Sequence, residues 1–153
     1  MSPLLNYDPI LLQLVLFTLI EHEKKIAVPI TVSTDGMLVS GYLVSAVEYF
    51  HGLAAQMEDR GLSTLLQQKA REAADEAEEI ARKFDNGILD STQESILHFL
   101  YLRDAYILPP AMTAFAPGSG EGFWWRCRLN AVTGFAWNAF VEQNNSEECP
   151  PAK

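Results

Sequence analysis

Positive charge is scarce in this sequence. Its 153 residues include eleven Lys and Arg against twenty Asp and Glu, which gives a formal net charge of −9. Nucleic acids and anionic lipid surfaces are bound largely through clustered Lys and Arg, so we expect neither as a partner. The acidic balance is compatible with a soluble protein whose copies repel one another, or with a basic protein partner.

Cysteine is rare too, with Cys127 in an aromatic segment and Cys149 in a polar tail. These two form neither a disulfide framework nor a paired-cysteine zinc motif. We therefore expect free thiols in a reducing cytoplasm. A chain of this length buries about 68–70% of its unfolded surface, so it needs no cross-link or metal to fold.

The motifs of common enzyme classes are missing. Glu48 and His51 have the spacing of a carboxylate–histidine metal pair, but a di-iron bundle needs two such pairs and the sequence has no second one. Gly118–Gly122 lacks the lysine of a P-loop and leads into a predicted strand, so it is no phosphate-binding loop. A Gly-x-Ser-x-Gly nucleophile elbow is absent. We predict no catalytic residue, no metal and no cofactor.

No apolar run is long enough to cross a membrane. The most apolar segment, Ile10–Ile20, is well short of the roughly 20 residues that a spanning helix needs. No positive residue precedes it and no A-x-A-like cleavage site follows it, so we expect no signal peptide. The expected location is therefore the cytoplasm.

This segment predicts a helix with unusual surface properties. Asp8 suits the N-cap and Pro9 the first helical position, and the helix is expected to run to about residues 24–25. Only Gln13 and Thr18 interrupt its apolar surface. Such a helix must be buried, either under the sheet of its own domain or against another chain.

A β-hairpin is predicted next. Residues 26–33 alternate between apolar and polar or small side chains, as in a half-buried strand, and Pro29 places this strand at an edge or a bulge. Asp35-Gly36 is a two-residue turn signal. Met37–Val44 forms the return strand, where Gly41 indicates a bulge, a bend or a close approach of another backbone.

Two helices are predicted after the hairpin. Ser45 and Glu48 fit a capping box, in which each side chain accepts a bond from a free backbone N–H. Gly61 is expected to break or bend the helix that follows. A second helix over Leu62–Phe84 has one narrow stripe of apolar residues, namely Leu62, Leu66, Ala70, Ala73, Ala77, Ile80 and Phe84.

Three further strands complete the chain, over Ile96–Leu108, Phe123–Asn130 and Thr133–Val141. Together with the hairpin they predict an α+β domain with a curved antiparallel sheet or a small open barrel. The expected organisation is an N-terminal apolar helix over residues 1–25, packed on the domain or in an oligomer interface. A single domain follows over residues 26–141, with a disordered polar tail over residues 142–153.

The segment Phe123–Arg128 (FWWRCR) has two distinct faces. Alternation places Trp124, Arg126 and Arg128 together, opposite a set of core residues that includes Trp125 and Cys127. Trp and Arg side chains are typical of protein–protein contacts. They also fit base stacking by a single-strand binder, or an arginine stem packed on an aromatic ring.

Three segments carry motifs in a fixed order. Ile30–Phe50 (ITVSTDGMLVSGYLVSAVEYF) holds V-S-G followed by S-A-x-E-Y-F, and Leu97–Pro110 (LHFLYLRDAYILPP) holds L-x-D. Phe123–Phe140 (FWWRCRLNAVTGFAWNAF) holds W-R-x-R/K-L/I-x-x-V-x-G-F. In their order and spacing, over roughly residues 26–140, these motifs resemble the gas vesicle accessory protein U family, GvpU.

The resemblance implies a cytoplasmic, non-enzymatic protein that helps gas vesicles form or brings them together in clusters. Its partners would be gas vesicle shell or accessory proteins, and we expect a homo-oligomer. The interaction residues that the sequence suggests come from the apolar helix and from the aromatic strand. They are Leu11, Leu14, Phe17, Trp124, Arg126 and Arg128.

Two other functions stay open on the sequence alone. A nucleic-acid-binding small barrel would use Trp124 and Arg126 for stacking, although the acidic charge argues against it. A small-molecule enzyme or ligand binder would place its pocket under the loop over residues 111–122, with His98 and Asp104 converging there.

Overall fold

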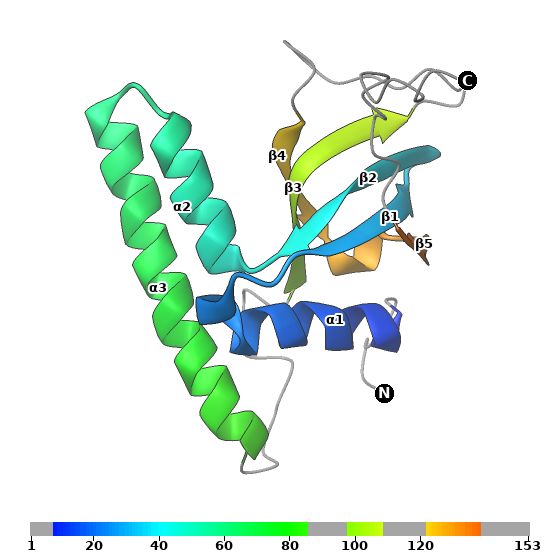
Figure 1. Ribbon diagram of the computed structural model, residues 1–153, viewed down its shortest axis with the longest axis horizontal. Helices are drawn as coiled ribbons and strands as arrows, with labels where there is room; N and C mark the ends of the chain where they lie inside the picture. The colour runs from blue at the N-terminus through cyan, green and yellow to red at the C-terminus, as the bar shows by residue number, and fades with distance from the viewer. Residues whose placement is uncertain (1–7, 86–97, 109–121, 139–153) are drawn as a thin grey trace, which may run out of the picture.

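The computed structural model describes residues 8–85, 98–108 and 122–138. In this part of the chain three α-helices and five antiparallel strands form an α+β domain with an open sheet of strand order β4-β3-β2-β1-β5 (Figure 1). The predicted fold class is therefore confirmed, with an open sheet. The elements are α1 (Pro9–Ile20), β1 (Val28–Thr34), β2 (Met37–Val44), α2 (Ala46–Gln56), α3 (Arg60–Asp85), β3 (Phe99–Leu108), β4 (Phe123–Arg128) and β5 (Gly134–Trp137).

Helix α1 begins as predicted and ends earlier. The Asp8 carboxylate accepts a hydrogen bond from the backbone N–H of Ile10 at 2.8 Å, and Pro9 occupies the first helical position. The α-helix stops at Ile20, and a 3₁₀ turn over His22–Lys24 follows. The residue after this turn, Lys25, has a φ of 51°, a left-handed conformation that cannot continue a helix.

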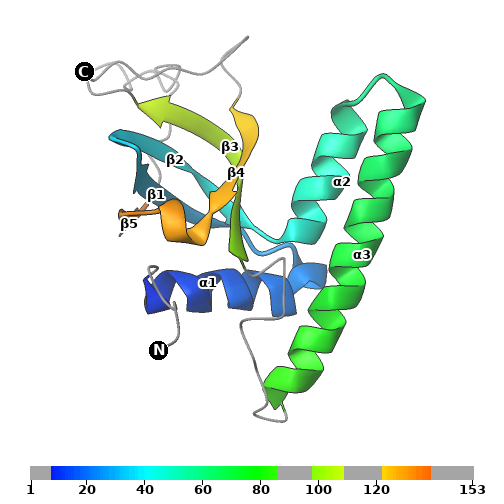
Figure 2. The same cartoon turned by 180° about the vertical axis from the view of Figure 1, so that it is seen from behind.

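Helix α1 lies along one face of the sheet (Figures 1 and 2). Its apolar side packs into the core with strand residues that all point to the same face of β1, β2 and β3. The helix therefore supplies one complete layer of the domain. The buried residues of this layer are Leu11, Val15, Leu16 and Leu19 from α1 and Ile30, Val32, Val39, Leu43, Leu100 and Leu102 from the strands.

The β1–β2 hairpin has the predicted turn, with Asp35 and Gly36 both at positive φ (50° and 76°). The expectation for Pro29 is wrong, because β1 lies between β2 and β5 and its register with β2 is regular. The Pro29 carbonyl accepts from the N–H of Asn138 at 2.9 Å. Since the nitrogen and carbonyl of a strand residue point to the same side, the missing N–H costs no bond to β2.

Strand β3 contains one extra residue at Asp104. Ser40 of β2 pairs with Tyr106 of β3, and Tyr42 pairs with Arg103. The two pairs are two residues apart along β2 and three residues apart along β3, so β3 contains one residue more. The register between β3 and β4 shifts at the same place. Asp104 has a φ of 51°, as the bulged residue of such a distortion often does.

Two glycines face this bulge, one from each side. Gly41 lies in β2, and Gly122 directly precedes β4. A Cβ on Gly41 would lie 2.9 Å from the Arg103 carbonyl oxygen and 3.1 Å from the Cα of Ala105. A Cβ on Gly122 would overlap the backbone of Asp104. The bulge indicated by Gly41 is thus confirmed, and the extra residue itself belongs to the partner strand β3.

Helices α2 and α3 form an antiparallel hairpin beside the sheet (Figure 1). The break between them is at residues 57–59 rather than at Gly61, because the Asp59 carboxylate accepts from the N–H of Leu62 at 2.9 Å and caps α3. The predicted stripe of α3 is buried over most of its length and exposed at Leu62 (51%). Its fully buried members are Ala70, Ala73, Ala77 and Ile80.

Gly41→Ala tests the bulge. Its Cβ would meet backbone atoms that cannot move aside without disturbing β3, so we expect a loss of about 1–3 kcal/mol in the free energy of unfolding. Gly134→Ala is the matched control, because a Cβ there meets nothing within 4 Å, and it should change stability by about 0.5 kcal/mol or less. Urea unfolding measures both. Equal effects of the two substitutions would contradict the close approach of Gly41 to the backbone of β3.

Candidate interaction surfaces

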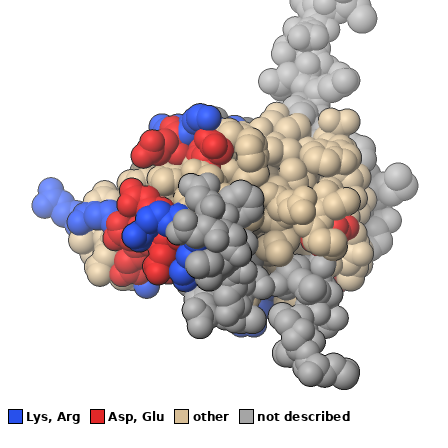
Figure 3. Space-filling view, turned by 90° about the horizontal axis from the view of Figure 1, so that it is seen from below, with Lys and Arg blue, Asp and Glu red and all other residues tan. Residues whose placement is uncertain are grey.

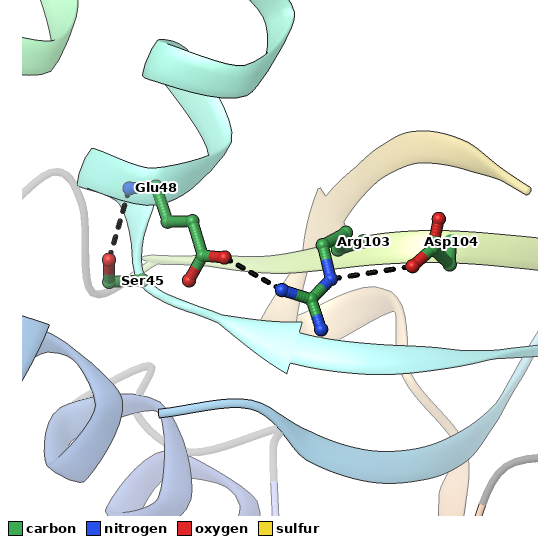
Figure 4. A network of polar contacts seen from close by, with 4 residues as sticks. All are labelled: Ser45, Glu48, Arg103 and Asp104. Carbon is green, nitrogen blue, oxygen red and sulfur yellow. Dashed lines mark hydrogen bonds and ion pairs between the residues drawn. The ribbon is translucent and has the colours of Figure 1, made fainter. Parts of the chain in front are cut away.

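A network of charged groups joins α2 to the bulge (Figure 4). The Ser45 hydroxyl accepts from the N–H of Glu48 at 3.1 Å, which is one half of the predicted capping box. The reciprocal half is replaced, because the Glu48 carboxylate accepts from Arg103 Nη1 at 2.9 Å. Arg103 Nε also lies 3.4 Å from the Asp104 carboxylate. Glu48 therefore helps to hold α2 on the sheet through an ion pair.

This ion pair is poorly solvated. The side chains of Glu48 and Arg103 are 16% and 34% exposed, and both Glu48 Oε2 and Arg103 Nε are shielded from solvent without a hydrogen bond. The 3.4 Å approach of Nε to Asp104 is thus an ion contact and not a hydrogen bond. The Arg103 guanidinium also lies over the Tyr42 ring, with its Cζ 5.3 Å from the ring centroid.

Trp124 packs on α2. A Cβ on Gly52 would overlap the indole ring, and the ring meets Tyr49 edge-on with centroids 6.0 Å apart. Tyr49 in turn contacts Tyr101 of β3 at 5.0 Å. This packing takes up part of the indole surface and leaves Trp124 half-buried. The nucleic-acid alternative therefore has less of this ring available for base stacking.

Arg126 and Arg128 lie on the same face of β4 as Trp124 and are exposed. Their guanidinium groups lie 4.5 Å and 6.0 Å from the centroid of the Phe99 ring. Arginine packing on an aromatic ring is thus present, and Phe99 supplies the ring. Sequence reasoning did not identify Phe99, which is brought here only by the pairing of β3 with β4.

The three α1 candidates have different environments. Leu11 is fully buried in the core, Leu14 is partly buried, and Phe17 is 50% exposed. Ile10, which sequence reasoning omitted, is 55% exposed. Ile10, Leu14 and Phe17 follow the i, i+4, i+7 spacing of one helix face, so they form a ridge on the outer side of α1. We call these three residues the α1 ridge.

The surface around the α1 ridge is nearly free of charge. Pro9–Ile20 contains no Asp, Glu, Lys or Arg. Seen from below, the side of the molecule with α1 is almost wholly uncharged apart from a small acidic spot, whereas the charged groups gather toward α3 (Figure 3). The α1 ridge is therefore an apolar surface at which little charge repulsion would oppose the approach of another acidic copy.

The described residues also line hollows, of which two are relevant. One of about 380 Å³ lies between α3 and the sheet, lined by Phe50, Leu65, Phe99 and Arg126 among others. A larger one of about 610 Å³ lies beside β5, between Leu38 and Trp137. Within the residues that the structure describes, no group of three or more His, Cys, Asp or Glu is placed to hold a metal ion.

The small-molecule alternative gains no support. The loop over residues 111–122 lies outside the described residues apart from Gly122. His98 precedes β3 and Asp104 lies in its middle, so the two are about 20 Å apart along the strand and do not converge. The predicted polar tail over residues 142–153 is also outside the described part.

Comparison with known proteins gives one match. A family model described as gas vesicle protein GvpU-like matches residues 8–140 of the chain. No curated protein and no solved structure matches. None of the helices in the described ranges is both long and apolar enough to cross a membrane.

Glu48→Ala tests the ion pair between α2 and β3. Removing the carboxylate leaves a poorly solvated Arg103, so we expect a loss of about 1–3 kcal/mol in unfolding free energy, between the values for exposed and buried pairs. Asp104→Asn is the control, because Asn tolerates positive φ and the Asp104 side chain is 53% exposed. It should cost less than about 1 kcal/mol. A loss for Asp104→Asn as large as that for Glu48→Ala would contradict this assignment.

Cys127 should react slowly with thiol reagents. Burial, and to a lesser extent the charge of Asp35, raises the pKa of its thiol from 9.0 to about 11. At pH 8 this leaves about 100-fold less thiolate than an unperturbed cysteine. The raised pKa stabilises the fold below pH 9, and that stabilisation is lost as the pH rises toward about 11. The alkylation rate of Cys127 in a Cys149→Ser variant can be measured in the folded protein and in urea. Equal rates in the two conditions would refute the predicted slow reaction of the folded protein.

Proposed function

The chain belongs to the GvpU-like family of gas vesicle proteins, and from this membership we propose that it is a non-enzymatic accessory protein that supports gas vesicle formation or clustering. It acts in the cytoplasm, at gas vesicles, through association with further copies of itself. It also contacts a gas vesicle shell protein or another accessory protein. The observation that carries the proposal is the exposed, uncharged α1 ridge.

The reason lies in electrostatics. Copies of a chain with a net charge of −9 repel one another over most orientations. Association is least opposed where charge is absent and apolar surface can be removed from water. The α1 ridge supplies both conditions, because Ile10 and Phe17 are half exposed on a helix without charged residues. Leu14 is the partly buried member of the ridge, and the neighbouring Leu11 is buried in the core.

The face of β4 suits a different contact. Arg126 and Arg128 are exposed cations held over the Phe99 ring, in a protein with few cations. They would pair with carboxylates of a gas vesicle protein, and the packed Trp124 fixes the strand that presents them. Arginine at this kind of rim fixes the orientation of a partner more than it adds affinity.

Phe17→Glu tests the proposal. A charge on the ridge should abolish self-association, measured as the mean mass by light scattering over a range of protein concentrations. Leu62→Glu is a matched control, because Leu62 is equally exposed on a helix (51% against 50%) and the change in net charge is identical. Leu62→Glu should associate like the wild-type protein.

The same variants can be tested on isolated gas vesicles. We expect wild-type protein and Leu62→Glu to co-sediment with vesicles and to cluster them, whereas Phe17→Glu should bind without clustering. A wild-type protein that stays monomeric at every concentration and leaves vesicles unbound would contradict the proposed function.

A further inference from the structure

A second uncharged apolar surface lies at the β5 edge of the sheet. It is the groove of about 610 Å³ beside β5, which we call the β5 groove. Its lining residues Thr31, Ser33 and Leu38 alternate along β1 and β2 with Ile30, Val32 and Val39, which face the core. Because successive strand residues point to opposite faces, this part of the groove opens away from the core layer that α1 covers.

The β5 groove is hollow because its floor has small side chains. On β5, Gly134 and Ala136 pair with Ser33 and Thr31 and share their face. Trp137 pairs with Ile30 and so points to the α1 side of the sheet, which means that the groove extends around the β5 edge. Leu38 and Trp137 are 42% and 58% exposed. Strand β5 pairs with β1 alone among the described strands, so it is an edge of the sheet.

Charge is missing from the β5 groove as well. None of the described residues that line it is acidic or basic. The rest of the chain carries nine more negative than positive charges, so a groove of this kind is one of the few places where another copy can approach without repulsion. A strongly basic partner would find no carboxylate there to bind.

We propose that the β5 groove receives the α1 ridge of a second copy of this chain. The ridge is convex, apolar and uncharged, with Phe17 and Ile10 projecting from it. The groove is concave, apolar and uncharged, and its volume exceeds that of one aromatic side chain. This inference rests on the proposed function, since it names the two surfaces through which self-association occurs.

The placement of the two surfaces determines the kind of assembly. Helix α1 is held by its core contacts against the face of the sheet that carries Ile30 and Val32. Leu38 lines the groove on the opposite face, so α1 cannot fill that side of the groove of its own chain. Each copy that donates its ridge keeps a free groove. Contacts between two different surfaces are heterologous and give open chains unless a rotation closes them. Such chains can connect vesicles over varying distances.

A mixing experiment with full-length variants tests this arrangement. Phe17→Glu removes the ridge and keeps the groove, whereas Leu38→Glu removes the groove and keeps the ridge. Each variant alone should be monomeric, and the equimolar mixture should form dimers and nothing larger, because only one productive contact exists. Light scattering after gel filtration reads the masses, and far-UV circular dichroism verifies folding. If Leu38→Glu fails to fold, Ala136→Glu blocks the same groove from the exposed edge strand.

The other outcomes separate this inference from the proposed function. If Leu38→Glu alone associates like the wild-type protein, the ridge binds something other than the groove, and the inference is wrong while self-association stands. If it self-associates normally but no longer binds vesicles, the occupant of the groove is a vesicle protein and the inference is again wrong. A mixture that stays monomeric shows that the two surfaces do not meet. A wild-type protein that is monomeric at every concentration would overturn this inference, and one that also leaves vesicles unbound would overturn the proposed function as well.

Discussion

Burial of one side of α1 against the sheet is the interaction on which the rest of the structure depends. Leu11, Val15, Leu16 and Leu19 cover the strand residues of the core, and each such side chain contributes about 1.5–3 kcal/mol when fully buried. A helix that is apolar nearly all round can bury only one side in this way. The remaining apolar side, with Ile10 and Phe17, is left in solvent, so the same helix that completes the core also creates the surface proposed for association.

The sheet has its own geometric constraint at the extra residue of β3. Asp104 occupies a left-handed conformation, with Gly41 and Gly122 next to it where a side chain would collide with the β3 backbone. The neighbouring Arg103 pairs with Glu48 and so connects the bulge to α2. The sequence motifs V-S-G (Val39–Gly41) and L-x-D (Leu102–Asp104) thus have a structural explanation, because they build the two sides of one bulge.

Much of the fold could be predicted from local sequence patterns. Asp35-Gly36 fixed the hairpin, the start of α1 followed from Asp8 and Pro9, and the alternation in β4 placed its two arginines on one face. These features depend on neighbours within a few residues. The contacts that local patterns did not indicate involve partners far along the chain. Glu48 binds Arg103 across 55 positions, and Trp124 packs on Gly52 of a helix that periodicity alone cannot orient. The β5 groove is formed by strands from both ends of the domain, so no local pattern could indicate it.

The central claim is that α1 of one copy docks on the β5 groove of the next, and site-directed cross-linking tests it most directly. In a chain with Cys127→Ser and Cys149→Ser, Phe17→Cys together with Leu38→Cys should form disulfides under mild oxidation as a ladder of dimers, trimers and larger species. Each single-cysteine variant should form few cross-links. Efficient dimers from Phe17→Cys alone, with no ladder from the double variant, would show that ridge meets ridge and would contradict the account.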